Sequence, residues 1–176
     1  MDDESDRRTS SSDAELEPRL PVEADLVRIC GRLNELGAKY VVVGGFAIIY
    51  GGYARSTGDI DLVLATDLVN EALVYRALEV LPDKAVRELQ PGEVAKYVVV
   101  RVADEVVVDL MRSASGIEYE EAAKEVVVRQ VQGVAIPFAS PRLLWRMKAH
   151  IHREKDAGDL VFLREYFAAR GEQPPD

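Results

Sequence analysis

Residues 44–64 read GGFAIIYGGYARSTGDIDLVL, so a glycine pair begins fifteen positions ahead of two aspartates that share one apolar segment. Side chains two residues apart on a β-strand point the same way, and Asp59 and Asp61 are therefore predicted to project together, away from Ile60 and Leu62. Two carboxylates a few ångströms apart repel each other unless a cation lies between them. Mg²⁺ prefers oxygen ligands and keeps waters or phosphate oxygens in its remaining positions. The aspartate pair thus predicts a divalent-metal site.

A third carboxylate is available in EVVVDLM, residues 105–111. Asp109 lies there among apolar side chains, and a charge in such a strand is costly unless it has a partner. If this strand pairs beside the DIDLVL strand, Asp109 shares the face of the aspartate pair and completes a site for two metal ions. A structural interpretation fits the same residues: Asp59 caps a strand, Asp61 pairs with Arg55, and Asp109 marks an exposed edge. Three acids in apolar strands, downstream of a glycine pair, favour the metal site.

The glycine pair supplies the other half of the predicted site. Gly44 and Gly45 follow the apolar run YVVV and precede a helical segment, so the backbone can approach a ligand closely and the helix N-terminus offers unpaired N–H groups to an anion. Arg55 and Thr57 are placed to reach phosphate oxygens or to orient Asp59. A tight turn and an ordinary salt bridge of Arg55 are the alternative explanations. The fingerprint G-x-G-x-x-G is absent from the sequence, which disfavours a Rossmann-type cofactor site.

Composition sets the broad class of the protein. Its 176 residues are 48% hydrophobic and 30% charged, as in an ordinary globular chain, and suffice for one domain with a buried core. The formal net charge of −9 repels nucleic acid, so any such partner has to be held by a local basic patch. The single cysteine, Cys30, excludes an internal disulfide framework, is expected to be buried, and favours a reducing, cytoplasmic setting.

The N-terminal segment differs from the rest of the chain. Residues 1–20 are rich in Ser, Asp, Glu and Arg with little to bury, which predicts a disordered tail ahead of a single domain at 21–176. This acidic, polar segment lacks the pattern of a signal peptide. The longest apolar stretch, residues 40–54, spans 15 residues and contains four glycines, whereas a membrane helix needs about 20 residues. No membrane is therefore expected among the partners.

Hydrophobic periodicity and turn residues predict a mixture of helices and strands. Expected helices cover residues 22–36, a short segment closing at 51–52, 66–81, 117–124, a segment opening at 140–141, and 155–169. Expected strands cover residues 40–43, 60–64, 96–102, 105–111, 126–131 and 134–138, with 96–111 and 126–138 as hairpins. This order predicts an α/β (α+β) fold, in which helices flank a mixed β-sheet and further helices follow at the C-terminal end.

The stretch at 44–64 resembles the nucleotidyltransferase superfamily that includes DNA polymerase β, whose pattern is a glycine pair, a spacer and Asp-hydrophobic-Asp-hydrophobic. Within this superfamily, the sequence pattern is most similar to that of proteins related to the AbiEii toxins and of the minimal nucleotidyltransferases. A second stretch, IPFASPRLLWRMKAHIHREKDAGDLVFL at 136–163, is similar to the C-terminal part of those proteins. Its matching residues are Pro137, Ser140, Pro141, Lys148, Lys155, Asp156, Asp159 and Leu160.

The resemblance implies a nucleotidyltransferase fold and transfer of a nucleoside monophosphate from an NTP, with pyrophosphate leaving. It implies two Mg²⁺ ions, with Mn²⁺ as an alternative, and an acceptor hydroxyl on RNA or tRNA, on a protein or on a small molecule. It also suggests the toxin of a toxin–antitoxin pair, with a cognate antitoxin as partner. The implied catalytic and metal-binding residues are Asp59, Asp61 and Asp109. The implied nucleotide-binding residues are Gly44, Gly45, Arg55, Thr57, Lys148, Lys155 and Asp156.

An inactive protein of the same fold, which binds nucleotide or a protein partner as a regulator, is the alternative. A degenerate copy is expected to have lost at least one of the three acids or the glycine pair. All of them are present, which favours the enzyme.

Basic residues gather in the C-terminal part of the sequence. Helical spacing from Arg142 predicts a stripe of Arg142, Arg146, His150 and Arg153 that faces nucleotide phosphates or an RNA acceptor. A solvated helix with salt bridges to glutamates explains the stripe equally well. His150 and His152 lie two positions apart and do not form a metal pair on a helix. Asp156 and Asp159 are expected to orient Lys148 or Lys155, or to cap the last helix.

Overall fold

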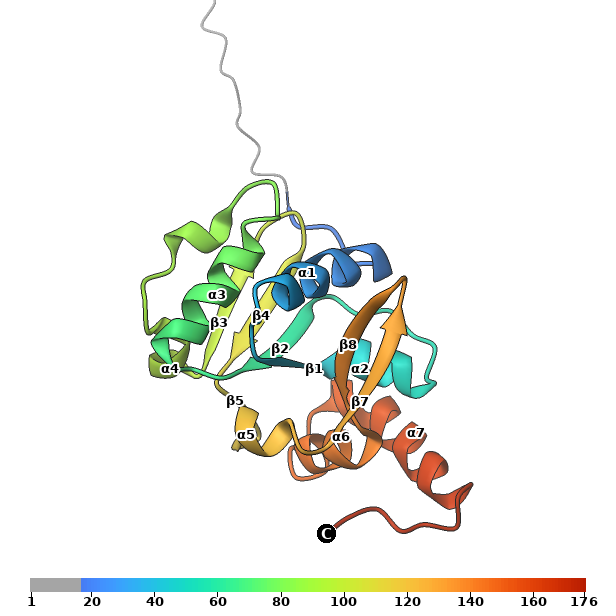
Figure 1. Ribbon diagram of the computed structural model, residues 1–176. Helices are drawn as coiled ribbons and strands as arrows, with labels where there is room; N and C mark the ends of the chain where they lie inside the picture. Colours follow the sequence, from blue (N-terminus) through green and yellow to red (C-terminus); the bar gives the residue numbers. More distant parts are fainter. Residues whose placement is uncertain (1–16) are drawn as a thin grey trace, which may run out of the picture.

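The structure is a computed structural model that describes residues 17–176, and a six-stranded mixed sheet forms its centre (Figure 1). The strands of this sheet are β1 (Tyr40–Val43), β2 (Ile60–Leu64), β3 (Val99–Ala103), β4 (Val107–Met111), β7 (Val126–Val131) and β8 (Val134–Ala139). Their order is β3-β4-β2-β1-β8-β7. β2 runs antiparallel to β1 but parallel to β4, and β1 runs parallel to β8. The predicted mixed sheet flanked by helices is confirmed.

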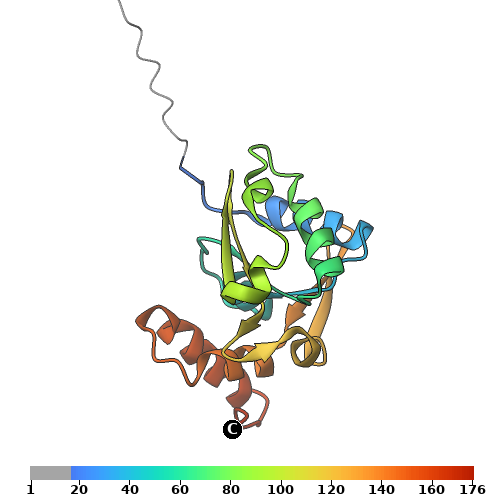
Figure 2. The same ribbon diagram turned by 90° about the vertical axis from the view of Figure 1, so that its left-hand side faces the viewer.

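Helices cover the sheet and continue beyond it. They are α1 (Glu23–Glu35), α2 (Gly44–Gly51), α3 (Leu68–Leu78), α4 (Glu93–Tyr97), α5 (Tyr119–Ala122), α6 (Pro141–Lys148) and α7 (Ala157–Ala168). The 3₁₀ turns η1 (Ala85–Glu88) and η2 (Glu154–Asp156) and a small two-stranded sheet, β5 (Ser113–Ala114) with β6 (Ile117–Glu118), complete the order. In Figures 1 and 2, α1 and α3 lie side by side against the sheet, while α6 and α7 lie together at the opposite end of the molecule.

The central strands are apolar because both of their faces are covered. All four residues of β1 are buried, as are four of the five residues of β2. In α1, the side chains of Leu26, Ile29, Cys30 and Leu33 recur at helical spacing and have no exposed surface, so this stripe packs on the core. Cys30 is buried, as the sequence predicts. These contacts fix β2, and with it the aspartate pair, at the middle of the sheet.

Several predicted elements have different bounds in the structure. Residues 93–97 form α4, so residues 96 and 97 are helical where a strand was expected to begin. Just before this helix, the Gln90 N–H donates a hydrogen bond of 3.0 Å to the Glu93 carboxylate. Ile117 begins strand β6 instead of a helix, since it pairs with Ala114. The last helix starts at Ala157 after the separate turn η2.

The chain before α1 is described from residue 17 onward, and most of the tail expected at 1–20 lies outside the described residues. Within the described residues 17–20, Arg19 donates two hydrogen bonds of 2.8 Å to the Asp25 carboxylate and a third, of 3.1 Å, to Glu105. The Asp25 carboxylate also accepts the Val22 N–H at 2.8 Å, which fixes the start of α1. None of the helices formed by residues 17–176 is long and apolar enough to span a membrane.

Candidate active site

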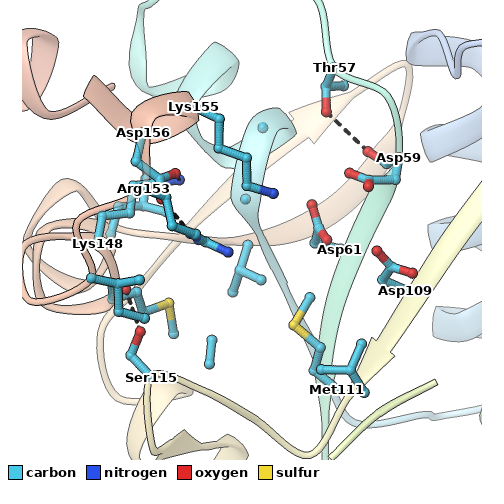
Figure 3. Close-up of a pocket in the computed structure, with 18 of the residues that line it drawn as sticks. Thr57, Asp59, Asp61, Asp109, Met111, Ser115, Lys148, Arg153, Lys155 and Asp156 are labelled. Carbon is cyan, nitrogen blue, oxygen red and sulfur yellow. Dashed lines mark hydrogen bonds and ion pairs between the residues drawn. The ribbon is translucent and has the colours of Figure 1, made fainter. Parts of the chain in front are cut away.

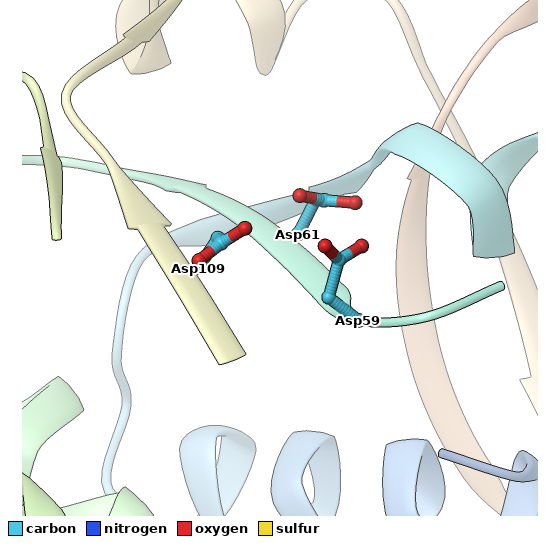
Figure 4. Close-up of side chains that lie close together, drawn as sticks. All are labelled: Asp59, Asp61 and Asp109. Atoms are coloured by element: carbon cyan, nitrogen blue, oxygen red, sulfur yellow. The ribbon is translucent and has the colours of Figure 1, made fainter. Parts of the chain in front are cut away.

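The three predicted carboxylates converge because β2 and β4 are neighbours in the sheet. The two strands run parallel with Asp61 directly opposite Asp109, and Asp59 immediately precedes β2 (Figure 4). One oxygen from each of the three carboxylates lies within 4.8 Å of the others. Across residues 17–176, this is the one group of three or more side chains that fits a metal ion. We call Asp59, Asp61 and Asp109 the acidic triad.

The acidic triad is electrostatically strained without a cation. Burial, followed by the charge and hydrogen bond of Asp59 and by the charge of Asp109, raises the pKa of Asp61 to about 8, against a smaller opposing effect of Lys148. A bound divalent ion relieves this repulsion, and three carboxylates form the hard oxygen donor set that Mg²⁺ and Mn²⁺ accept. The residues present therefore fit the implied metal.

An arginine that the sequence analysis did not single out also contacts the acidic triad. Arg101 lies opposite Asp109 in the β3–β4 pair. Its Nε and one terminal nitrogen each donate to a different Asp109 oxygen at 2.9 Å, and the same terminal nitrogen lies 3.3 Å from an Asp59 oxygen. The hydrogen bonds to Asp109, together with its charge, raise the pKa of Arg101. The hairpin residues 103–107 set this register, and their exact pairing could not be read from the sequence.

The two glycines close the site from the other side, as the first residues of α2. Gly44 has φ of +64°, and a Cβ there would lie 2.2 Å from the Asp61 Oδ2 atom. A Cβ on Gly45 would lie 2.3 Å from Thr57 Oγ1 and 2.6 Å from Thr57 Cβ. Thr57 in turn donates a hydrogen bond to the Asp59 carbonyl oxygen at 3.2 Å. The glycine turn is thus packed directly onto the residues that carry the acidic triad.

Gly45→Ala is expected to lower the free energy of unfolding by about 1 to 3 kcal/mol, because the added methyl overlaps Thr57. The double variant Gly45→Ala/Thr57→Gly removes the overlapping atoms and should be no less stable than Thr57→Gly alone. Gly31→Ala in α1 is the matched control: its nearest atom would be 3.6 Å away, so this change should be neutral or stabilising by up to about 1 kcal/mol. Urea unfolding of the four variants checks the prediction. Equal stability of Gly45→Ala and the wild type would contradict the close packing of the turn.

A second group of charged residues forms an ion-pair network that joins α6, η2 and α7. Lys148 Nζ lies 2.7 Å from Asp156 Oδ1 and 3.1 Å from Asp159 Oδ2. Arg153 Nε donates to the other Asp156 oxygen at 2.7 Å. Arg55 donates to both Asp159 oxygens, at 2.8 and 2.9 Å. Because Lys148, Asp156 and Asp159 are all buried, this network anchors the chain after the glycine turn to the C-terminal helices.

The network lowers the pKa of one of its acids, Asp156. Burial alone would raise the pKa of Asp156, but the hydrogen bond and charge of Lys148, followed by those of Arg153, outweigh burial and lower it. Arg55 is engaged with Asp159 and does not pair with Asp61, which removes one part of the structural interpretation of the aspartates.

A cavity of about 450 Å³ separates the acidic triad from this network. Arg153 and Lys155 extend into it from the C-terminal side, toward the triad (Figure 3). A second part of its lining is apolar and is formed by Val43, Val99, Met111, Ala114, Leu144, Met147 and Ile151. The cavity therefore has acidic, cationic and apolar walls, although the whole chain is strongly acidic.

All ten residues expected at the site line this cavity. They are Gly44, Gly45, Arg55, Thr57, Asp59, Asp61, Asp109, Lys148, Lys155 and Asp156. The predicted stripe of Arg142, Arg146, His150 and Arg153 does not form, because α6 ends at Lys148. Arg146 instead pairs with Glu121 and Glu125 outside the cavity, whereas Arg153 reaches the cavity from the turn that follows α6.

Comparison with solved structures shows the same fold in other nucleotidyltransferases. The lincosamide antibiotic adenylyltransferase LnuA, solved with lincomycin bound, has a TM-score of 0.55 and 16% identity, over 83% of this chain and 98% of that one. An antigenic nucleotidyltransferase-like protein from Paracoccidioides brasiliensis has a TM-score of 0.50 and 16% identity, over 86% of this chain and 78% of that one. A search of curated proteins finds no match.

Sequence comparison identifies the family of the chain. Residues 22–172 match a single protein family, and this range includes every helix and strand from α1 to α7. The chain belongs to this family, which is described as "Nucleotidyl transferase of unknown function (DUF2204)".

Proposed function

We propose that the protein transfers a nucleoside monophosphate from an NTP to an acceptor hydroxyl, with Mg²⁺ or Mn²⁺ at the acidic triad. The observation that carries this proposal is the convergence of three carboxylates at the mouth of a glycine turn, within a cavity that is also lined by cationic side chains. Two divalent ions held by Asp59, Asp61 and Asp109 would stabilise the charge on the attacking and leaving oxygens of an in-line displacement.

The remaining chemistry is assigned to the protein's own residues. The acceptor oxygen bonds to the α-phosphorus as the bond to the bridging oxygen breaks, and pyrophosphate leaves with that oxygen. The proton of the acceptor hydroxyl passes to a carboxylate oxygen of Asp109. Positioning and electrostatics carry most of such catalysis, so the geometry of the acidic triad matters more than the basicity of one group.

The triphosphate is assigned to the space between the glycine turn and the C-terminal cations. Gly44 and Gly45, the first residues of α2, line this space, and a helix N-terminus favours an anion. Arg153 and Lys155 supply positive charge from the opposite wall. Lys148 is held by Asp156 and Asp159, so its role is to set the position of this wall and to add charge from behind it.

The acceptor is assigned to the apolar side of the cavity, where Met111, Met147 and Ile151 lie. A concave, partly apolar site beside charged groups suits a small molecule that carries a hydroxyl. LnuA, which shares the fold, was solved with the small molecule lincomycin bound. The alternative acceptors are a hydroxyl on RNA or tRNA and a hydroxyl on a protein. A further candidate role is that of a cytoplasmic toxin with a cognate antitoxin.

Incubation with each of the four NTPs, labelled at the α-phosphate, is expected to move the label to an acceptor and release pyrophosphate only when Mg²⁺ or Mn²⁺ is present. Total RNA, cell-lysate protein and a mixture of small hydroxyl compounds are offered in separate reactions, with EDTA as the control. Depressed growth on expression, relieved by a neighbouring gene product, would add the toxin role. Nucleotide binding without transfer to any of these acceptors would instead favour the inactive regulator.

A further inference from the structure

Arg101 binds two of the three carboxylates that are assigned to the metal. Both Asp109 oxygens accept hydrogen bonds of 2.9 Å from it, and an Asp59 oxygen lies 3.3 Å from one of its terminal nitrogens. Asp61 receives no hydrogen bond from Arg101. Within residues 17–176, Arg101 forms ion pairs with the acidic triad and with no other group. Its guanidinium therefore serves as the internal cation of the site.

The position of Arg101 allows its side chain to leave. β3 is an edge strand of the sheet, and 61% of the Arg101 side chain is exposed. Asp109 is buried, but the charge of Arg101 faces water, which screens it and can hydrate the guanidinium once it leaves. A divalent ion has twice the charge and binds carboxylate oxygens directly, so it competes effectively for the same oxygens.

We propose that Arg101 is a positioning residue of the metal site: it neutralises Asp109 and Asp59 in the metal-free protein and is displaced from them when the divalent ion binds. The metal site is thus assembled before the metal arrives, at the cost of a lower metal affinity. Displacement also frees the Asp109 oxygens, one of which the proposed function requires as proton acceptor. The inference rests on the proposed function only in its use of the acidic triad as a metal site.

Mn²⁺ binding without nucleotide, measured by the electron paramagnetic resonance signal of free Mn²⁺, tests the displacement. Removing a like charge a few ångströms from a divalent ion should strengthen binding, so Arg101→Met is expected to lower the Kd by roughly tenfold. Arg101→Lys keeps the charge and should return the Kd toward that of the wild type. Arg112→Met is the matched control, because Arg112 pairs with Glu118 at 3.1 Å and does not touch the acidic triad.

Thermal unfolding separates displacement from a purely structural role. Metal-free Arg101→Met should melt below the wild type, because its acidic triad lacks a counter-ion, and Mn²⁺ should raise its melting temperature by more than it raises that of the wild type. A structural role alone would lower the melting temperature of Arg101→Met by the same amount with and without Mn²⁺, and would leave the Kd for Mn²⁺ unchanged. Circular dichroism confirms folding, and Arg101→Gln provides a second neutral variant.

An unchanged or higher Kd in both neutral variants would overturn the inference, as would the absence of Mn²⁺ binding in every protein. The outcomes differ from those that test the proposed function. If the neutral variants bind Mn²⁺ more tightly but no NTP is ever consumed, only the proposed function fails. If transfer occurs while the Kd is insensitive to Arg101, only the present inference fails.

Discussion

Asp61→Asn is expected to abolish nucleotide transfer, by roughly a thousandfold or more in kcat, while the metal-free protein stays as stable as the wild type or becomes more stable. Activity falls because Asn offers a neutral amide where the metal ions need a carboxylate. The free energy of unfolding is maintained, since an ionised Asp61 destabilises the folded state. Burial and the neighbouring charges of Asp59 and Asp109 raise the pKa of Asp61 from 3.8 to about 8.

The pH dependence of this difference follows from the direction of the shift. The folded protein holds a proton on Asp61 up to a pH of about 8, whereas the unfolded chain releases it near 3.8. Rising pH between these values therefore favours unfolding of the wild type and not of Asp61→Asn. The melting temperature of the variant relative to the wild type should increase from pH 5 to pH 8, measured without metal.

Asp83→Asn is the control for this prediction, because Asp83 is exposed and lies outside the cavity. It should leave both the transfer rate and the pH dependence of the melting temperature unchanged. Loss of folding in Asp61→Asn would mean that the Asp61 carboxylate is a structural element. Retained transfer at the wild-type rate would remove Asp61 from the metal site.

Lys148→Met is expected to lower the free energy of unfolding by about 3 kcal/mol and to reduce nucleotide transfer as a consequence. Lys148 is buried between Asp156, at 2.7 Å, and Asp159, at 3.1 Å. Removing its ammonium leaves each of these buried carboxylates with one arginine partner, and an undercompensated buried charge is strongly destabilising. Urea unfolding and a transfer assay on the same preparation measure the two effects.

Lys155→Met separates stability from nucleotide binding. Lys155 is exposed and has no ion-pair partner in the described part of the chain, so its removal should change the free energy of unfolding by less than about 0.5 kcal/mol. It should still raise the KM for the NTP, because a cation facing the triphosphate is lost. If Lys148→Met were as stable as Lys155→Met, Arg55 and Arg153 would suffice to neutralise the two acids.

Much of the site could be predicted from the sequence because it follows local rules. The spacing of Asp59 and Asp61 alone places both side chains on one side of a strand. The glycine pair between a strand and a helix predicts a close backbone approach, and the structure shows Asp61 and Thr57 packed against these two glycines. The fold class could also be predicted, since the order of helices and strands leaves few ways to cover a sheet.

Other features depend on which segments become neighbours. The stripe predicted from Arg142 to Arg153 failed because helical spacing cannot indicate that the helix ends at Lys148, where a turn brings Asp156 back to the Lys148 amine. Arg101 gave no sequence signal, since its contact with Asp109 depends on the register of a hairpin rather than on its spacing from any motif.

By itself, the sequence determined the fold class, the aspartate pair and the glycine turn, because strand alternation and backbone conformation depend on residues close together in the chain. The tertiary structure alone decided that β4 lies beside β2, that Arg101 neutralises the acidic triad, and that Lys148 is buried between two acids. Such contacts join residues distant in sequence, and they form only where burying the whole core makes those particular neighbours the most stable arrangement.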